Sequence, residues 1–312
     1  MKYRPKHIAE YILLRSVAFV VCVLPYRAAL GLGWGVGALA FFGFGFRRNK
    51  VLKRMRSVFG ERYSEKEYRR MAWISCRNMV FSAIEVIRVP RVTREWCNSI
   101  FEYGESLEIL KRYLAETEKG AIIALPHTGS WDLGGIAYSL NDVPTVIIPG
   151  RQSNPLANDY FDRVRRDRGI NAFPRGDAGS TRKIMHAVRK GGVLAIMPDA
   201  RMRTPGIEMP LLGGTANLGA GMATFARIAG VPIFPVMVTR EGWTRHRIRP
   251  FPTVEPDMSL DKQADVQRMT AIVLKEFDRE IQADPEQWFW FNSRWVLDPV
   301  AEPKKDSDDS DQ

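Results

Sequence analysis

Ala121–Gly135, with the sequence AIIALPHTGSWDLGG, is the stretch around which this chain is organised. Its short apolar run ends at Pro126, as is typical of a buried strand closed by a turn. His127 follows at once, and a Thr-Gly-Ser turn leads into a helix expected to begin at Trp131. We therefore expect His127 at the carboxyl end of a strand, where open α/β sheets place their ligands. Asp132, in the first turn of that helix, would lie close enough to hold the imidazole.

This His–Asp pair allows two interpretations. A histidine held by a carboxylate has a fixed tautomer and can act as a general base. Alternatively, His127 is a loop histidine with a solvated aspartate nearby, because a motif needs its structural context. Ser130 is expected to cap the following helix with its hydroxyl, which would leave that hydroxyl unavailable as a nucleophile. The chain also has no G-x-S-x-G elbow, which disfavours a serine hydrolase.

Apolar runs alternate with helical patterns throughout the second half of the chain. Strands are expected at 143–150, 193–199 and 231–240, with a short strand within 200–214. Helices are expected at 156–168, 180–190, 215–230 and from 261 into an aromatic segment. Strands that alternate with helices predict an α/β fold, a mostly parallel sheet covered by helices on both faces.

The composition divides the chain into four regions. These are an apolar membrane anchor at 1–46, a basic helical region at 47–118, an α/β core at 119–298 and an acidic disordered tail at 299–312. In the anchor, residues 28–46 carry no charge. As a helix they would measure roughly 28 Å, about the thickness of a bilayer's hydrocarbon core.

A basic run, RRNKVLKRMR, follows the apolar segment directly and marks the cytoplasmic side of an inner membrane. The alternative is a pair of buried amphipathic helices. Whether the anchor crosses the bilayer or lies in its interface stays open.

The charge balance points to an anionic partner. The formal net charge is +11, and the last twelve residues contribute −3, leaving +14 on the rest. Anionic lipid or an acidic carrier protein fits this surface. Nucleic acid does not, because the basic runs lack the interleaved aromatic residues of a stacking platform. Three cysteines without a CxxC pair and four scattered histidines indicate neither a disulfide framework nor a metal site.

Charged residues gather at the ends of the expected strands. His127 follows the first strand, Arg151 the second and Asp199 ends the third, with Arg175 between the last two. Because parallel strand ends share one edge of a sheet, these residues should converge. Taken singly, each arginine could be an ordinary surface residue, and Asp199 could cap a helix.

A base without a protein nucleophile suits direct transfer of an acyl group to a substrate hydroxyl. The oxyanion would then need donors, either backbone N–H groups around 128–130 or an arginine.

The chain resembles the bacterial lipid A biosynthesis acyltransferase family, within the wider lysophospholipid-acyltransferase-like group. Five blocks in the same order carry the resemblance, and they cover nearly the whole chain except the acidic tail. They are His127-TGSW-Asp132, Arg151-QS-Asn154-Pro155, Phe173-P-Arg175-G-Asp177, Pro198-Asp199-A-Arg201 and Pro285-EQWFWFNS-Arg294-Trp295.

This resemblance implies transfer of a fatty acyl chain from acyl carrier protein or coenzyme A to a hydroxyl of a membrane glycolipid, with no further cofactor and no metal. It implies that His127 is the base and that Asp132 orients it. It further implies substrate-binding roles for Arg151, Asn154, Arg175, Asp199, Arg201 and Arg294. The lipid A branch usually has Glu at the position of Asp132, whereas the resemblance to the phosphatidylinositol mannoside branch includes an Asp at this position. The expected acceptor is a lipid A precursor, with another glycolipid or lysophospholipid as the alternative.

Overall fold

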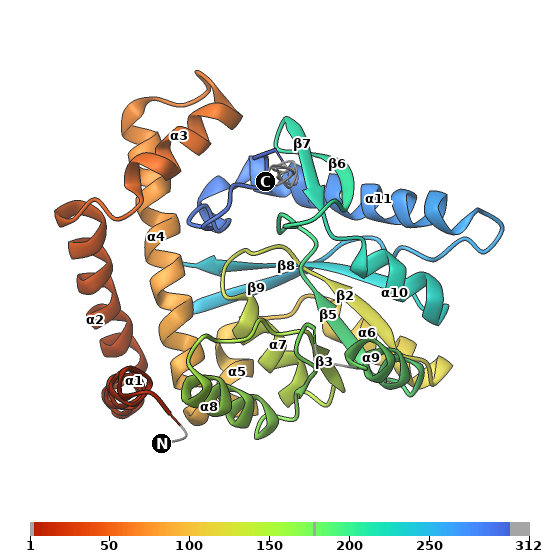
Figure 1. The fold of residues 1–312 in the computed structure, drawn as a ribbon, viewed down its shortest axis with the longest axis horizontal. Coiled ribbons are helices and arrows are strands. Elements are labelled where there is room, and N and C mark those ends of the chain that lie inside the picture. The colour runs from red at the N-terminus through yellow and green to blue at the C-terminus, as the bar shows by residue number, and fades with distance from the viewer. Residues whose placement is uncertain (1–2, 177–178, 300–312) are drawn as a thin grey trace, which may run out of the picture.

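The computed structural model describes residues 3–176 and 179–299. Its strands are β1 (Phe101–Glu102), β2 (Ala121–Ala124), β3 (Thr145–Ile147), β4 (Asn171–Ala172), β5 (Val193–Ile196), β6 (Ile207–Leu211), β7 (Gly214–Leu218), β8 (Ile233–Glu241) and β9 (Arg245–Pro250). Seven of them form one sheet in the order β1-β9-β8-β2-β5-β3-β4 (Figure 1). The five strands from β8 to β4 are parallel, and only the β8–β9 pair is antiparallel. The predicted α/β fold with a mostly parallel sheet is confirmed.

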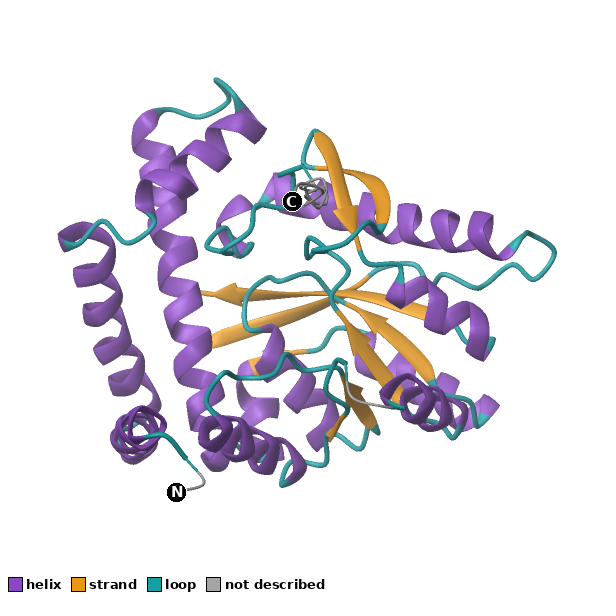
Figure 2. Ribbon diagram, viewed as in Figure 1, coloured by secondary structure: helices purple, strands orange, loops and turns teal. Residues whose placement is uncertain are grey.

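Helices cover both faces of this sheet (Figure 2). The helices of the core region are α5 (Arg94–Ile100), α6 (Ser106–Thr117), α7 (Trp131–Leu140), α8 (Pro155–Arg166), α9 (Ser180–Arg189), α10 (Gly221–Ala229), α11 (Lys262–Ala283) and the short η3 (Pro285–Gln287). Strand β2 shows why two layers form, because successive side chains point to opposite faces. Ile122 and Ala124 pack into the core with α9, α10 and α11, whereas Ala121 and Ile123 pack with α5 to α8.

The N-terminal part forms the left margin of the molecule in Figure 1. It consists of α1 (Pro5–Val23), α2 (Tyr26–Ala38), the π-helical turn η1 (Leu39–Gly43), α3 (Arg48–Phe59), α4 (Glu65–Arg88) and η2 (Val89–Arg91). In the described part of the chain, no helix by itself is long and apolar enough to cross a membrane. The segment Tyr26–Gly43 passes that test only together with Arg48–Phe59, to which it is bent by 81°.

Some expected elements are different in the structure. Residues 214–218 form β7, which pairs with β6 in a separate two-stranded sheet, and the helix starts only at Gly221. The expected helix at 215–230 is therefore wrong in its first turns, since Gly219 and Gly221 interrupt the helical pattern. Strands β1, β4 and β9 were absent from the expectation, because two are two residues long and β9 carries alternating arginines. The expected acidic tail lies outside the described residues beyond Pro299.

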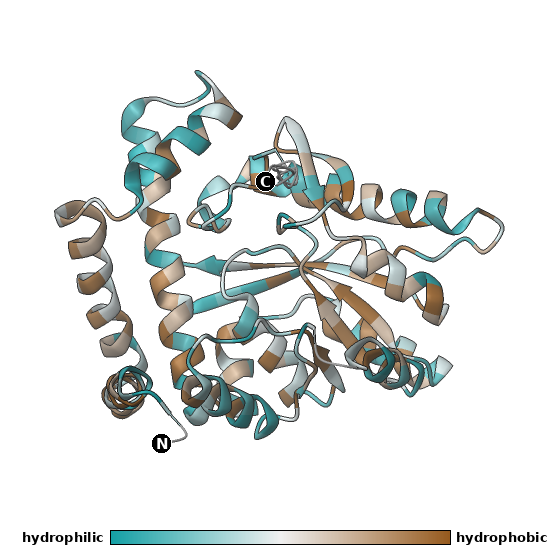
Figure 3. Cartoon of the chain, in the orientation of Figure 1, coloured by the Kyte–Doolittle hydropathy of each residue, from teal (hydrophilic) through white to brown (hydrophobic). Residues whose placement is uncertain are grey.

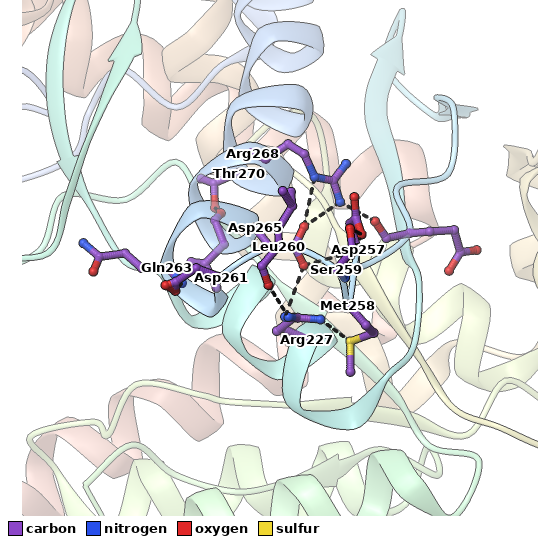
Figure 4. Close-up of polar contacts among 12 residues, drawn as sticks. Arg227, Asp257, Met258, Ser259, Leu260, Asp261, Gln263, Asp265, Arg268 and Thr270 are labelled. Carbon is purple, nitrogen blue, oxygen red and sulfur yellow. Dashed lines mark hydrogen bonds and ion pairs between the residues drawn. The ribbon is translucent and has the colours of Figure 1, made fainter.

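A buried carboxylate fixes the long connection between β9 and α11 (Figure 4). Asp265 is fully buried, and Arg268 donates two hydrogen bonds to it at 2.6 and 2.9 Å. The Nε of Arg227, on α10, lies 3.4 Å from the other carboxylate oxygen, which also accepts a hydrogen bond from the Asp257 amide. These contacts tie the loop to α10 and α11, two helices of the same layer.

Candidate active site

The histidine of the organising stretch lies at the carboxyl edge of the sheet, as expected. Strand β2 ends at Ala124, and the chain still pairs with β5 through the Leu125 amide, which donates to the Ile196 carbonyl. His127 follows, and its carbonyl accepts a hydrogen bond from the Phe289 amide. The C-terminal aromatic segment therefore closes over the end of the strand and fixes the backbone of the histidine.

Asp199 holds both the ring and the backbone of His127. Nδ1 of His127 lies 2.7 Å from one carboxylate oxygen of Asp199. The second oxygen accepts from the His127 amide at 2.7 Å and from Nε1 of Trp288 at 2.8 Å. Asp199 is 1% exposed. Burial alone would raise the pKa of this carboxyl, but His127 and the hydrogen bonds outweigh burial and lower it, so Asp199 is ionised.

These contacts determine the state of the imidazole. Because the Asp199 carboxylate can only accept, Nδ1 of His127 carries the proton and Nε2 keeps its lone pair when the ring is neutral. The edge of the ring packs against Trp131, with ring centroids 5.2 Å apart, and the side chain is 18% exposed. Burial would lower the pKa of His127, but the Asp199 carboxylate raises it above the ordinary value of 6.5. The group is thus a base oriented through Nδ1.

Asp132 does not make the contact that the sequence predicts. The hydrogen bond to the imidazole comes from Asp199, whereas Asp132 acts on His127 only as a nearby charge that raises its pKa. Loss of hydration raises the pKa of Asp132 itself, against the opposing charges of Arg165 and His127. The residue keeps contact with solvent where it lines a pocket together with Arg165. Asp132 lies in the first turn of α7, which begins at Trp131.

The turn after His127 is held from two sides. The Gly129 amide donates to the Gln287 carbonyl at 3.1 Å, and the Gly129 carbonyl accepts from Oγ of Ser82, on α4, at 2.8 Å. The Thr128 amide donates to the Pro126 carbonyl at 2.8 Å. Two of the backbone N–H groups that the sequence offers as oxyanion donors are therefore already engaged. Among residues 128–130, the Ser130 amide therefore remains as the backbone candidate for an oxyanion donor.

Ser130 occupies the N-cap position of α7, but no side-chain hydrogen bond caps the helix. Its Oγ is buried and has no hydrogen-bond partner among the residues that the structure describes. The expected hydroxyl cap is therefore wrong. The backbone conformation of Ser130, with φ −115° and ψ 69°, turns the chain into the helix instead.

A pocket of about 290 Å³ opens beside Trp131 and Asp132. Its apolar walls come from α4, η2, α7 and α8 and from the ends of β2, β3 and β5: Val86, Val89, Leu125, Ile136, Ile147, Ile148, Phe161, Val164, Ile170, Ala195 and Met197. Its polar residues are Asp132, Arg151, Gln152 and Arg165. An apolar cavity with a few convergent polar groups next to a base is the usual form of a small-molecule site.

Of the substrate-binding candidates, Arg151 lies in this pocket and Asn154 does not. The Asn154 side chain is buried, caps α8 through the Leu156 amide, and donates to the His7 carbonyl and to Glu10 at 2.9 Å each. These hydrogen bonds join α8 to α1. The resemblance implies a substrate-binding role for Asn154, whereas its side chain is used for this contact between the two helices.

The remaining arginine candidates lie outside the pocket lining. Arg175 is exposed on the loop before α9, and Arg294 is exposed in the C-terminal segment. Arg201 donates to the carbonyls of Asp298 and Pro299 and so ties the end of the described chain to the sheet. Their roles toward a substrate stay predictions.

Three residues that the sequence did not single out complete the site. Arg165 faces the pocket from α8, because it lies on the same helical face as the buried Val164 and half-buried Phe161. Gln287 holds the His127 turn, and its side chain also pairs with the Arg240 backbone in both directions, at 2.8 and 3.1 Å. Trp288 supports Asp199. The Pro285-Glu-Gln-Trp block was the available signal for the last two.

Comparisons with known proteins show the family of this chain. The family model for bacterial lipid A biosynthesis acyltransferase matches residues 2–296. A phosphatidylinositol mannoside acyltransferase from Mycolicibacterium smegmatis is 23% identical over 184 residues, 58% of each chain. A protein of the same name from Mycobacterium tuberculosis is 23% identical over 69% of this chain and 66% of its own length. A lipid A biosynthesis palmitoleoyltransferase from Escherichia coli is 24% identical over 89% of this chain and 88% of that one. The matched part thus spans less than two thirds of the mycobacterial relatives.

Proposed function

This chain belongs to the bacterial lipid A biosynthesis acyltransferase family, and on that basis we propose that it transfers a fatty acyl chain from a thioester to a hydroxyl of a lipid A precursor. The observation that carries the proposal is the His127–Asp199 pair. One ring nitrogen is held at 2.7 Å by a buried carboxylate and the other keeps its lone pair, beside an apolar pocket at the carboxyl edge of the sheet. That arrangement supports general-base catalysis without a protein nucleophile.

The tautomer of His127, with the proton on Nδ1, determines which nitrogen takes part in the reaction. Nε2 of His127 takes the proton of the acceptor hydroxyl while the hydroxyl oxygen attacks the thioester carbonyl carbon. Asp199 stabilises the imidazolium that forms, as its contact with Nδ1 allows. The tetrahedral intermediate then collapses, the carbon–sulfur bond breaks, and the imidazolium returns the proton to the leaving thiolate. This sequence balances without a metal or an organic cofactor.

The pocket supports an acyl chain as the transferred group. Its walls are almost entirely aliphatic or aromatic, and burial of each methylene in such surroundings contributes about 0.8 kcal/mol. The guanidinium groups of Arg151 and Arg165 lie at the same pocket and suit an anionic part of a substrate or a developing oxyanion. Because the Thr128 and Gly129 amides are engaged, the oxyanion donors that the sequence offers are the Ser130 amide and an arginine.

The charge of the chain supports an acidic acyl carrier protein as the donor, with the coenzyme A thioester as the other candidate. The same charge supports attachment to anionic lipid at the cytoplasmic face of an inner membrane. In this proposal Arg175 and Arg294 bind the substrate or carrier through exposed surface outside the pocket lining, and Arg201 acts there by holding the C-terminal segment.

A second acceptor has a specific observation in its favour. Two of the relatives are named phosphatidylinositol mannoside acyltransferases, and the family's first block ends here in Asp132 rather than Glu. The same chemistry on a mannoside-type glycolipid or a lysophospholipid is therefore the alternative.

Purified protein distinguishes these candidates. Acyl carrier protein and coenzyme A thioesters of the same fatty acid would be offered with either a lipid A precursor or a phosphatidylinositol mannoside, and the products read by mass spectrometry. We expect one acyl chain to be added to the lipid A precursor, faster from acyl carrier protein. Acylation of the mannoside alone would support the alternative acceptor, and transfer to neither would overturn the proposed function. His127→Ala should be inactive, whereas His186→Ala, an exposed histidine on α9, should match the wild type.

A further inference from the structure

Exposed apolar side chains are concentrated on the first two helices and the turn that follows them. Among residues 3–176 and 179–299, nineteen large hydrophobic residues are exposed, and fourteen of them lie between residues 8 and 46; we call these fourteen the lipid face. They are Ile8, Ile12, Leu13, Val17, Phe19, Val20, Val23, Leu32, Trp34, Val36, Leu39, Phe42, Phe44 and Phe46. Exposed apolar side chains that gather on one part of a molecule in this way mark an interface with lipid or another protein.

The arrangement of the helices makes this face flat. In Figure 1, α2 runs within the plane of the picture at the left margin while α1 is seen end-on below it, so their axes define one plane. No other described element is drawn to the left of that plane. Figure 3 shows mostly apolar or neutral colours along both helices, in contrast to the teal of α3.

The opposite face of α2 is packed tightly against α4. Ala29, Leu30 and Gly33 are buried there against Phe81 and Ile84. A Cβ on Gly33 would lie 2.2 Å from Cδ1 of Ile84, so glycine permits this close approach. Helix α2 is therefore an integral part of the fold. One of its sides packs against α4 and the other side is exposed.

Buried polar contacts fix the same junction. The Tyr26 hydroxyl, at the start of α2, donates to Glu85 of α4 at 2.5 Å. Arg88, one turn further along α4, donates to the carbonyls of Val21 and Leu24, where α1 ends. Glu85 is also held by two hydrogen bonds from Arg240 of β8, at 2.8 and 2.6 Å. Because these groups are buried, α1 and α2 cannot leave α4 without breaking the hydrogen bonds of Tyr26 and Arg88.

These contacts decide how the lipid face can meet a membrane. If α2 crossed the bilayer, α4 and the edge of the sheet behind it would enter the hydrocarbon together with Arg77, Glu85 and Arg240, which is strongly unfavourable. An orientation with both helix axes in the membrane plane buries only the bare sides. Exposed basic residues before, within and after this segment, namely Lys6, Arg27 and Lys50, suit anionic headgroups.

We propose that α1, α2 and η1 lie within one leaflet of an anionic lipid membrane and do not cross it. This inference goes beyond the proposed function, because it would hold for a protein with no acyltransferase activity. It also places the pocket at the membrane surface, since α1 contacts α8 through Glu10 and Asn154, and the Arg15 guanidinium lies over the Tyr160 ring. An acceptor lipid could then reach the site from the leaflet.

Site-directed labelling tests the topology. In a Cys22→Ser background, where the two remaining cysteines are buried, single cysteines replace Lys6, Arg27 or Lys50. Each is exposed to a membrane-impermeant maleimide in sealed inverted vesicles and in spheroplasts. We expect all three to react in the same preparation. Reaction of position 27 from the side opposite to 6 and 50 would show a hairpin crossing. Reaction of 6 and 27 from the side opposite to 50 would show a single crossing. Either result overturns the proposal.

A second experiment measures the insertion of the lipid face into lipid. It identifies a protein that does not bind lipid. A polarity-sensitive fluorophore is attached at Phe44→Cys, which is 80% exposed in the lipid face, and at the control Lys275→Cys on α11. On addition of vesicles of phosphatidylethanolamine and phosphatidylglycerol, emission should rise several-fold at position 44 and stay unchanged at 275. An unchanged signal at 44 would contradict the proposal, whereas loss of acyl transfer in these variants would concern only the proposed function.

Discussion

Nδ1 of His127 and a carboxylate oxygen of Asp199 lie 2.7 Å apart, and the other oxygen of Asp199 accepts a hydrogen bond from the backbone of the same histidine. The two residues come from neighbouring strands, β2 and β5, which run parallel and end at the same edge. The orientation of the base is thus a consequence of sheet register. Residues 72 positions apart meet because their strands pair.

Asp199→Asn should slow acyl transfer and move its pH profile. Asparagine keeps the shape but removes the charge that raises the pKa of His127, so the acidic limb of kcat against pH should shift to lower pH. The maximal rate should fall by on the order of 10²–10⁴-fold, because the tautomer and the imidazolium lose their support. Steady-state kinetics over a range of pH checks this. An unshifted profile at near wild-type rate would show that Asp199 does not act on the base.

Gly135→Leu should shorten the acyl chain that the enzyme prefers. Gly135 lies in the pocket wall on α7, and a Cβ at this position would have no other atom within 4 Å. The added side chain would fill the pocket, and each methylene that no longer fits costs about 0.8 kcal/mol, or roughly fourfold in kcat/KM. Competition between donors of different length measures the effect. Gly221→Leu, at an equally open position outside the pocket, is the control, and the same preference in both variants would argue against this pocket.

Gly129→Ala should damage both the turn and the activity. Gly129 has φ +53°, and a Cβ there would lie 2.5 Å from the Val238 carbonyl oxygen. Strain of the backbone alone costs about 1–3 kcal/mol, and the clash adds to it and displaces the His127 turn. Gly213→Ala is matched for the positive φ, at +73°, but meets no atom within 4 Å. Thermal unfolding of the two variants separates the contributions, and equal losses in both would refute the clash.

Glu85→Gln should destabilise the protein strongly near neutral pH. It leaves Arg240 buried without its counter-charge, a change that typically costs about 3–5 kcal/mol. Burial would raise the pKa of Glu85, but Arg240 and His246 outweigh it and lower the pKa below the ordinary value of 4.5. The pair therefore stabilises the fold above pH 4.5, and this contribution is lost as the pH falls through the lower folded-state pKa.

Denaturation of wild type and Glu85→Gln in the same detergent, at neutral and acidic pH, checks this prediction. The difference between them should shrink at acidic pH. Glu65→Gln removes the exposed partner of Arg56 and should leave the unfolding midpoint unchanged. A Glu85 variant as stable as the Glu65 variant would mean that the buried pair contributes nothing net.

The sequence predicted the local features of this molecule well and the long-range contacts poorly. The period of apolar residues revealed β2, β5 and β8, and the Pro126-His127 junction revealed the strand edge. The sequence alone could not show which carboxylate contacts Nδ1 of His127. Asp132 is close to His127 in the sequence, whereas Asp199 is brought close only by the pairing of β2 with β5. For the same reason the motifs that contain Arg201 and Asn154 could not show what these side chains bind. Arg201 binds a carbonyl of the C-terminal segment, and Asn154 binds a carbonyl of α1.

Short or polar elements were the least predictable. Strand β9 alternates arginine with buried His246 and Ile248, and its strand character depends on pairing with β8. The N-terminal apolar stretch was recognised from composition, but its break at η1 and its packing on α4 depend on Gly33 and on buried partners far along the chain. Composition could therefore not decide between a crossing helix and an interfacial one.

The most direct test of the central claim is lipid mass spectrometry of the source cells with and without the gene, complemented by wild type, His127→Ala or His186→Ala. We predict that lipid A loses one acyl chain without the gene, and that wild type and His186→Ala restore it while His127→Ala does not. Restoration by His127→Ala would contradict the assignment of the base, and an unchanged lipid A with a shift in another glycolipid would contradict the proposed acceptor.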